Sequence, residues 1–213
     1  MLKKLYTLLL DLVFPLECVS CSAPDTLLCD RCERSIPVRN RHVQRPTEHL
    51  DTLVICSTYK EATLKAIITR FKYNGVAAYA APLVRLLEKG YRSLPHHVDL
   101  HVVPIPLHKR KRRIRGYNQS EILARALCEN LRLPIDTNLM RIRYTPQQSK
   151  RSREERLRNV EKAFRYDGEE APRHLLLIDD VTTTFATLES AARELKRRGA
   201  ETVDALVLAQ NRD

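Results

Sequence analysis

Apolar residues along this chain gather into short runs that alternate with segments of helical spacing. A run of four or more aliphatic residues is typical of a strand buried on both faces, as in parallel sheets. The pattern predicts strands at 53–59, 100–106, 175–178 and 203–208, and helices at 62–73, 78–91, 121–131 and 188–195. This alternation favours right-handed parallel crossovers, and therefore an α/β fold that binds ligands at the carboxyl edge of its sheet.

The strand at 175–178 is the most informative, because two carboxylates, Asp179 and Asp180, follow it directly. A hydroxyl-rich turn comes next, and then the helix at 188–195. This arrangement leaves free N–H groups at the helix N-terminus, where the helix dipole favours an anion such as a phosphate. The adjacent carboxylates can accept hydrogen bonds from a sugar diol. The plainer interpretation is a parallel strand whose terminal acids cap a helix.

This stretch resembles the motif with which type I phosphoribosyltransferases bind 5-phosphoribosyl pyrophosphate (PRPP): four hydrophobic residues, two acids, then Thr-Thr-Gly-x-Thr. The resemblance implies that the acids hold the ribose hydroxyls and that the turn holds the 5′-phosphate. The residues implied to bind the ligand are Asp179, Asp180, Thr182, Thr183, Thr184, Ala186 and Thr187. Phe185 departs from the motif, because the family has glycine there and glycine permits positive φ and close backbone approach. No catalytic residue is assigned.

Positive charge is concentrated in one part of the chain. The 213 residues hold 37 Lys and Arg against 26 Asp and Glu, a net charge of +11. Residues 108–165 alone hold 17 cations and 6 acids, so the remaining residues are balanced at 20 against 20. Such a segment suggests a polyanionic partner, namely pyrophosphate, nucleic acid or an acidic protein. A solvated basic face is the alternative.

Four cysteines near the start have the spacing of a metal site: Cys18-x-x-Cys21, seven residues, then Cys29-x-x-Cys32. Two such pairs bring four sulfurs to one tetrahedral centre, which indicates a structural zinc ion. Two disulfides or an iron–sulfur cluster are the alternatives. Four protein ligands leave no open position on the metal, so catalysis is not expected there.

Further segments resemble the ComF family, of the ComFC or GntX type. They are Val-Pro-Ile-Pro-Leu-His at 103–108, Arg-x-Arg-Gly-Tyr-Asn-Gln-Ser at 113–120, Arg-x-Arg-x-Thr-x-x-Gln-Ser at 141–149, and Phe-Lys-Tyr at 71–73. The cysteine knuckle behind a Leu-rich N-terminal helix is similar too. The resemblance implies a type I phosphoribosyltransferase fold, Mg²⁺ bound together with PRPP, and a role in natural transformation, in the handling or inward transport of single-stranded DNA.

In the phosphoribosyltransferase layout, the loop after the strand at 100–106 meets the pyrophosphate, and a mobile loop corresponding to 143–158 closes over the site. We therefore expect Arg113, Arg115, Lys150 and Arg151 to bind pyrophosphate and Lys109, Arg110, Lys111 and Arg112 to bind nucleic acid. A first helical turn at 152–158 is the alternative for the second half of that loop. Asn118 or Ser120 is expected to cap the helix at 121–131.

The chain divides into an amphipathic helix at 1–16, a zinc module with a polar linker at 17–50, and a phosphoribosyltransferase-like domain at 51–213. No apolar run approaches the length of a membrane span. We expect a cytoplasmic protein, with contact at the inner face of the membrane as the less favoured option. A competence helicase or recombination mediator is a further partner. The alternative functions are a working phosphoribosyltransferase on a nucleobase-like acceptor and a PRPP-sensing regulatory protein.

Overall fold

A five-stranded, mostly parallel sheet forms the centre of the protein. The computed structural model describes residues 16–73, 77–94, 99–144 and 163–211. The strand order is β1-β2-β7-β6-β3, in which only β1 runs antiparallel to its neighbour. The strands are β1 (Arg41–Gln44), β2 (Thr52–Thr58), β3 (Leu100–Pro104), β6 (His174–Thr182) and β7 (Thr202–Gln210).

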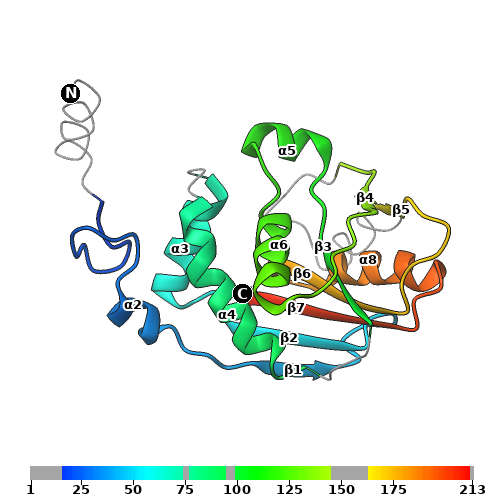
Figure 1. The fold of residues 1–213 in the computed structure, drawn as a ribbon, viewed down its shortest axis with the longest axis horizontal. Helices are drawn as coiled ribbons and strands as arrows, with labels where there is room; N and C mark the ends of the chain where they lie inside the picture. The colour runs from blue at the N-terminus through cyan, green and yellow to red at the C-terminus, as the bar shows by residue number, and fades with distance from the viewer. Residues whose placement is uncertain (1–15, 74–76, 95–98, 145–162, 212–213) are drawn as a thin grey trace.

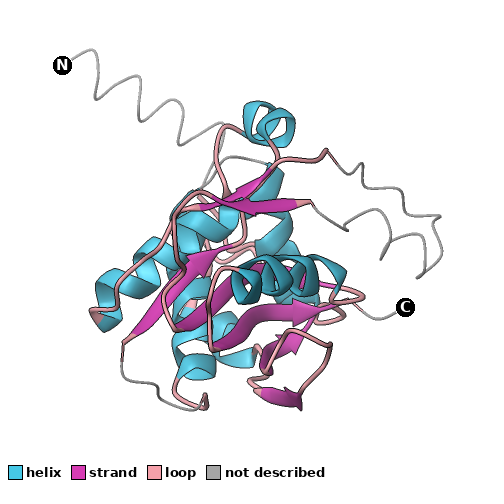
Figure 2. Ribbon diagram, turned by 90° about the vertical axis from the view of Figure 1, so that its right-hand side faces the viewer, coloured by secondary structure: helices cyan, strands magenta, loops and turns pink. Residues whose placement is uncertain are grey.

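Helices cover both faces of this sheet, so the molecule has three layers (Figures 1 and 2). One face carries α3 (Ala62–Tyr73), the 3₁₀ turn η1 (Ala77–Tyr79), α4 (Ala80–Tyr91) and α6 (Gln119–Leu131). The other carries α8 (Ala186–Arg197) and a small antiparallel pair, β4 (Leu139–Arg141) and β5 (Phe164–Tyr166). Successive residues of β6 enter opposite cores, because side chains alternate across a strand: Leu176 and Ile178 face the first layer, and Leu175 and Leu177 face the second.

The α/β class and all eight predicted elements are confirmed, but two segments differ from expectation. Residues 39–50, expected as a polar linker, contribute β1 to the sheet and bury Leu50 in the second core. Basic residues expected in a loop form the helix α5 (Lys109–Arg115), which is closed by Gly116 in the left-handed conformation (φ 82°). The short helix α2 (Asp30–Ser35) was not expected. The N-terminal segment 1–15 lies outside the described residues, and no described helix is long and apolar enough to cross a bilayer.

Replacing Gly90 with alanine is expected to destabilise the protein by about 1–3 kcal/mol, which urea unfolding would measure. A Cβ at Gly90 would lie 2.6 Å from Cys56 Sγ and 2.6 Å from Leu206 Cδ1, so α4 could not keep its distance from the sheet. Alanine otherwise favours a helix over glycine by about 1 kcal/mol. A measured loss of stability would therefore report the clash. The double variant Gly90→Ala/Leu206→Val should recover part of it, whereas a single variant as stable as the native protein would contradict this packing.

Candidate functional site

The two acids of the motif lie near the carboxyl end of β6, where side chains from two helices meet them. Lys72 Nζ, at the end of α3, lies 2.8 Å from Asp180 Oδ1, and both side chains are largely buried. Ser120 Oγ, in α6, donates a hydrogen bond of 2.9 Å to Asp179 Oδ1. The strand continues beyond the acids to Thr182, because Thr182 still pairs with Gln210 of β7. The carboxylates are therefore held between α3, α6 and the sheet.

Burial and the neighbouring charge of Asp180 raise the pKa of Asp179 to about 6, although Ser120 and Lys72 act in the opposite direction. For Lys72, burial lowers the pKa but attraction to Asp180 and Asp179 outweighs it, so its pKa is raised and the ammonium stays charged. The site thus holds one buried ion pair, Lys72 with Asp180, and one carboxyl group, that of Asp179, whose pKa is close to neutral pH. Such a pair can accept hydrogen bonds from vicinal hydroxyl groups.

The turn between β6 and α8 has the backbone conformation that glycine would favour, although Phe185 occupies it. Phe185 has φ 62° and ψ −1°, in the left-handed region, and stands at the N-cap of α8 without a side-chain cap. Its ring is half-buried and packs against the second core together with Val43. The first N–H groups of a helix have no partner inside that helix, and the side chain of Phe185 does not cap them here.

The hydroxyl and methyl groups of this turn differ in their exposure. Thr183 is exposed, Thr184 and Thr187 are half-buried, and Thr182 and Ala186 are buried. The loop before β2 fixes the first turn of α8, because His49 Nδ1 lies 2.7 Å from Glu189 Oε1 and the His49 N–H donates to Glu189 Oε2 at 3.1 Å. The position of the helix N-terminus is therefore set by contacts away from the turn itself.

Arg141 of β4 attracts Asp179, and Lys111 of α5 is repelled by Lys72, the partner of Asp180. Lys111 and Arg115, one turn apart on α5, are half-buried. Burial lowers the pKa of Lys111, as does repulsion from Arg141, Arg115 and Lys72, so these four cations lie close together. Burial also lowers the pKa of Arg141, which is opposed by its attraction to Asp179. The exposed cations of α5 are Lys109, Arg110, Arg112 and Arg113.

Of the residues expected to bind pyrophosphate, Arg115 is half-buried and Arg113 is exposed on α5. Of those expected to bind nucleic acid, Lys111 is half-buried and Lys109, Arg110 and Arg112 are exposed. Lys150 and Arg151 lie outside the described residues.

Three contributors to the site were missed, namely Lys72, Ser120 and Arg141. Lys72 stands inside the Phe-Lys-Tyr motif, which was the signal for it. Asn118 stands at the N-cap of α6, as predicted, but its side chain makes no cap hydrogen bond, because its Nδ2 donates to Ile105 O. Ser120 instead bonds Asp179.

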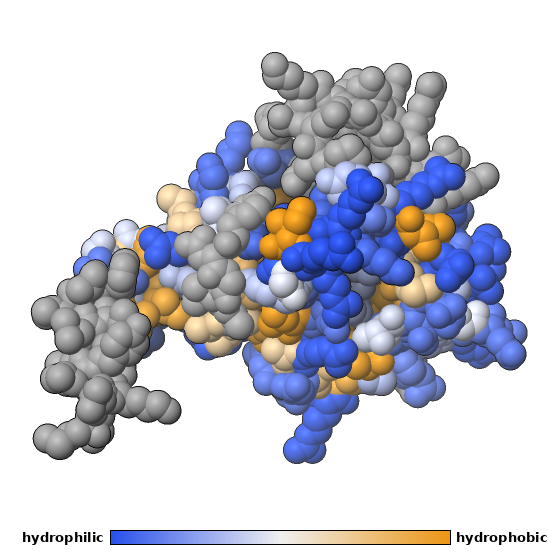
Figure 3. Space-filling view, turned by 90° about the horizontal axis from the view of Figure 1, so that it is seen from above, coloured by the Kyte–Doolittle hydropathy of each residue, from blue (hydrophilic) through white to orange (hydrophobic). Residues whose placement is uncertain are grey.

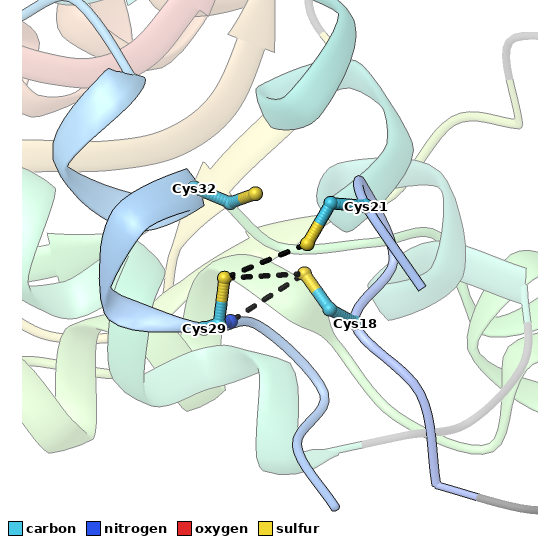
Figure 4. Close-up of side chains that lie close together, drawn as sticks. All are labelled: Cys18, Cys21, Cys29 and Cys32. Atoms are coloured by element: carbon cyan, nitrogen blue, oxygen red, sulfur yellow. Dashed lines mark hydrogen bonds between the residues drawn. The ribbon is translucent and has the colours of Figure 1, made fainter. Parts of the chain in front are cut away.

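The four predicted metal ligands gather at one point (Figure 4). Cys29 Sγ lies 3.8 Å from Cys18 Sγ and 3.7 Å from Cys21 Sγ, and all four sulfurs, including that of Cys32, lie within 4.8 Å of one another. A tetrahedral ion with bonds of about 2.3 Å would place its sulfurs about 3.8 Å apart, so the donor set fits zinc. Burial raises the pKa of Cys18, but N–H groups led by that of Cys29 outweigh it and lower the pKa to about 6, which favours the thiolate.

This four-cysteine module, residues 18–35, is docked on the first helical layer. Arg85 of α4 forms two hydrogen bonds with Glu33, of 2.6 and 2.5 Å, and Ser20 Oγ lies 3.0 Å from Thr63 Oγ1 of α3. Val19, Leu27 and Leu28 pack against the first core. Since α3 begins beside the module and carries Lys72 in its last turn, one helix connects the cysteine cluster to the acids.

Fold and site together define an α/β protein with a strand–turn–helix site and an N-terminal four-cysteine module. No family model matches the sequence. The chain is 31% identical over 201 residues to the DNA utilization protein YhgH of Salmonella typhimurium, which covers 91% of this chain and 83% of the relative. It is 32% identical over 168 residues to competence protein F of Haemophilus influenzae, covering 75% and 73%. The chain belongs to the ComF family.

Among solved structures, the chain is similar to the glutamine PRPP amidotransferase from B. subtilis in complex with ADP and GMP, with 17% identity and a TM-score of 0.41 over 61% of this chain and 26% of that one. It is also similar to adenine phosphoribosyltransferase from Thermoanaerobacter pseudethanolicus, with 10% identity and a TM-score of 0.40 over 84% and 99%. Since both TM-scores are below 0.5, we base no conclusion about ligands on these matches.

Proposed function

We propose that this protein acts in natural transformation, where it handles single-stranded DNA or moves it inward, and that it binds a PRPP-type ligand at the end of β6. The observation that carries the ligand proposal is the left-handed Phe185 between the acid pair and α8, because it preserves the backbone of a phosphate-binding turn without glycine. The names of the relatives, DNA utilization protein and competence protein F, support the role with DNA.

In this proposal each group of the site has one task. Asp179 and Asp180 accept hydrogen bonds from the ribose hydroxyls, and the turn from Thr182 to Thr187 holds the 5′-phosphate through its N–H and hydroxyl groups. Lys111 and Arg115 attract the pyrophosphate, with Arg113, Lys150 and Arg151 as further candidates. Mg²⁺, when bound, neutralises pyrophosphate charge and needs few protein ligands.

The remaining assignments are also proposals. The cysteine cluster holds a structural zinc ion, and the chain divides into a helix at 1–16, a zinc module at 17–50 and a phosphoribosyltransferase-like domain at 51–213. The protein acts in the cytoplasm, with contact at the inner face of the membrane as the less favoured option. A competence helicase or recombination mediator would receive the DNA.

Calorimetry with PRPP and Mg²⁺ tests the ligand proposal. The double variant Asp179→Asn/Asp180→Asn should bind more weakly by roughly 150-fold or more, because each of the two charged hydrogen bonds contributes about 1.5–3 kcal/mol. Asp167→Asn, which changes an exposed acid on the loop before β6, should bind like the native protein. The absence of binding heat from the native protein would overturn the proposal.

A second candidate is transfer of the phosphoribosyl group to an acceptor. The raised pKa of Asp179 favours it, since a carboxyl group that titrates near pH 6 can hold or release a proton during a reaction. Release of pyrophosphate from PRPP with candidate acceptors would establish turnover. Binding without release would leave a binding or regulatory role.

A further inference from the structure

The helix α5 presents two faces with different surroundings. Lys111 and Arg115 are half-buried, whereas Lys109, Arg110, Arg112 and Arg113 are exposed. Arg112 has a distant ion-pair partner in Glu121, at 3.8 Å, and Ile114 is 82% exposed. The outward face is therefore a cationic surface, and none of the side chains of α5 is buried.

An exposed aromatic ring lies beside this outward face. Tyr144 is 41% exposed, and the guanidinium of Arg110 lies 5.4 Å from its ring centroid. The ring of His108, at the N-cap of α5, lies 5.2 Å from the Tyr144 ring at an angle of 61°. Burial and the cations around it, led by Arg110, lower the pKa of His108, so this ring is uncharged at neutral pH. Two neutral rings and a guanidinium thus share one patch.

Among the Phe and Tyr side chains whose exposure the structure describes, Tyr144 is the exposed one. Tyr117, the nearest alternative in the sequence, is engaged in the fold: its hydroxyl group donates to Phe71 O and its ring centroid lies 5.8 Å from that of Phe71. A flat ligand that approached the outward face of α5 would therefore meet Tyr144.

We propose that Tyr144, flanked by His108 and Arg110, is a base-stacking platform that makes the outward face of α5 selective for single-stranded nucleic acid over duplex. This inference rests on the proposed role with DNA and assigns its recognition site. Exposed cations can follow the phosphates of either form, but only a single strand offers the face of a base to an aromatic ring. Tyrosine stacks on any base, so the selectivity is for strandedness and not for sequence.

The surface favours this partner over a membrane. Hydrophobic residues on the face seen in Figure 3 are scattered among hydrophilic ones and form no continuous apolar stripe. Ile114 and Ile142, which is 49% exposed, are the exposed aliphatic residues of this region. A helix of seven residues with one aliphatic side chain lacks the apolar face with which an interfacial helix enters a bilayer.

The experiment measures binding of a labelled single strand, and of the duplex of the same sequence, to the full zinc-loaded chain by fluorescence anisotropy at several salt concentrations. Tyr144→Ala should weaken single-strand binding by roughly 5- to 150-fold and leave duplex binding and the slope of log K against log salt unchanged. Tyr144→Phe should bind like the native protein, because it keeps the ring, and so should Ile142→Ala, which removes neighbouring apolar area only. Arg112→Gln/Arg113→Gln should reduce the magnitude of the salt slope by about 0.7 per lost phosphate contact.

Two results would overturn the platform but leave the role with DNA intact. In the first, the Tyr144→Ala variant binds single strands as tightly as the native protein does. In the second, the variant loses as much affinity for the duplex as for the single strand. A native chain that binds neither form of DNA but binds vesicles of anionic phospholipid would overturn the platform and the role with DNA together. Circular dichroism of each variant would separate these results from a loss of fold.

Discussion

Replacing Lys72 with methionine is expected to lower the free energy of unfolding by about 3–5 kcal/mol, because it removes the partner of a buried carboxylate. The Lys72 side chain is 16% exposed and that of Asp180 is 9% exposed, so water cannot replace the lost ammonium. Lys72 also lowers the pKa of Asp179. Without it, two adjacent acids would remain buried, with the Ser120 hydroxyl group donating to Asp179.

The loss should depend on pH in a stated direction. The pKa of Asp179 in the folded protein, about 6, already exceeds its ordinary value of 3.8, and removing Lys72 raises it further. A carboxyl group with a raised folded pKa binds a proton more readily in the folded state, so stability falls as pH rises through this interval. The deficit of Lys72→Met should therefore be larger at about pH 8 than at about pH 5, as measured by urea unfolding.

Two variants control this prediction. Lys65→Met changes an exposed lysine on the same helix and should leave stability within about 0.5 kcal/mol of the native protein. Lys72→Arg keeps the charge and should retain part of the stability. If Lys72→Met were as stable as Lys65→Met at both pH values, the buried ion pair would not exist in solution.

Replacing Cys29 with serine is the second change with a large expected effect. Cys29 Sγ lies 3.8 Å from Cys18 Sγ and 3.7 Å from Cys21 Sγ, so its loss breaks the tetrahedral set. Zinc contributes about 10–16 kcal/mol to the folding of peptides with such sites, and a segment of this size has too small a core of its own to replace that. We expect the variant to lose its zinc, about one ion per chain in the native protein, and residues 18–35 to exchange amide hydrogens rapidly.

The consequences should extend to α3, since Ser20, Glu33 and the leucines of the module contact α3, α4 and the first core. Hydrogen exchange should therefore also rise at the start of α3. Cys128→Ala is the matched control, because this buried cysteine lies outside the cluster and its removal should leave the zinc content unchanged. A Cys29→Ser chain that kept zinc and native exchange in the module would contradict the assignment.

The sequence was sufficient for the fold because periodicity is a local property. Continuous aliphatic runs at 175–178 and 203–208 could be buried only as central parallel strands, and the helices followed from their spacing. The strand β1 was missed because Arg41–Gln44 is exposed along most of its length, so an edge strand looks like a polar linker. Its pairing with β2 is a tertiary contact that no local pattern records.

The site was predictable only in part, for a similar reason. Asp179 and Asp180 stand next to each other in the chain, and the cysteine pairs have a regular spacing, so both could be found by reading. Lys72 precedes Asp180 by more than a hundred residues in the sequence and reaches it only after the sheet has formed. The division of α5 into two faces was hidden as well, because six cations in seven residues give no hydrophobic signal to orient a helix.

Phe185 shows how an aromatic residue can replace the glycine of the motif. The sequence suggested that an aromatic residue could not replace the glycine of the motif without cost, and the structure keeps φ at 62° with the ring packed on the second core. A left-handed conformation at a bulky residue is strained. The packing of the ring stabilises it in place.

A crystal structure with PRPP and Mg²⁺ tests the central claim most directly. We predict that the 5′-phosphate lies at the N-terminus of α8 on the N–H groups of the turn, that the ribose hydroxyls lie within hydrogen-bonding distance of Asp179 and Asp180, and that Phe185 keeps its positive φ. PRPP bound elsewhere, or a Phe185 ring that fills the turn while the carboxylates stay paired only with Lys72 and Ser120, would contradict the account.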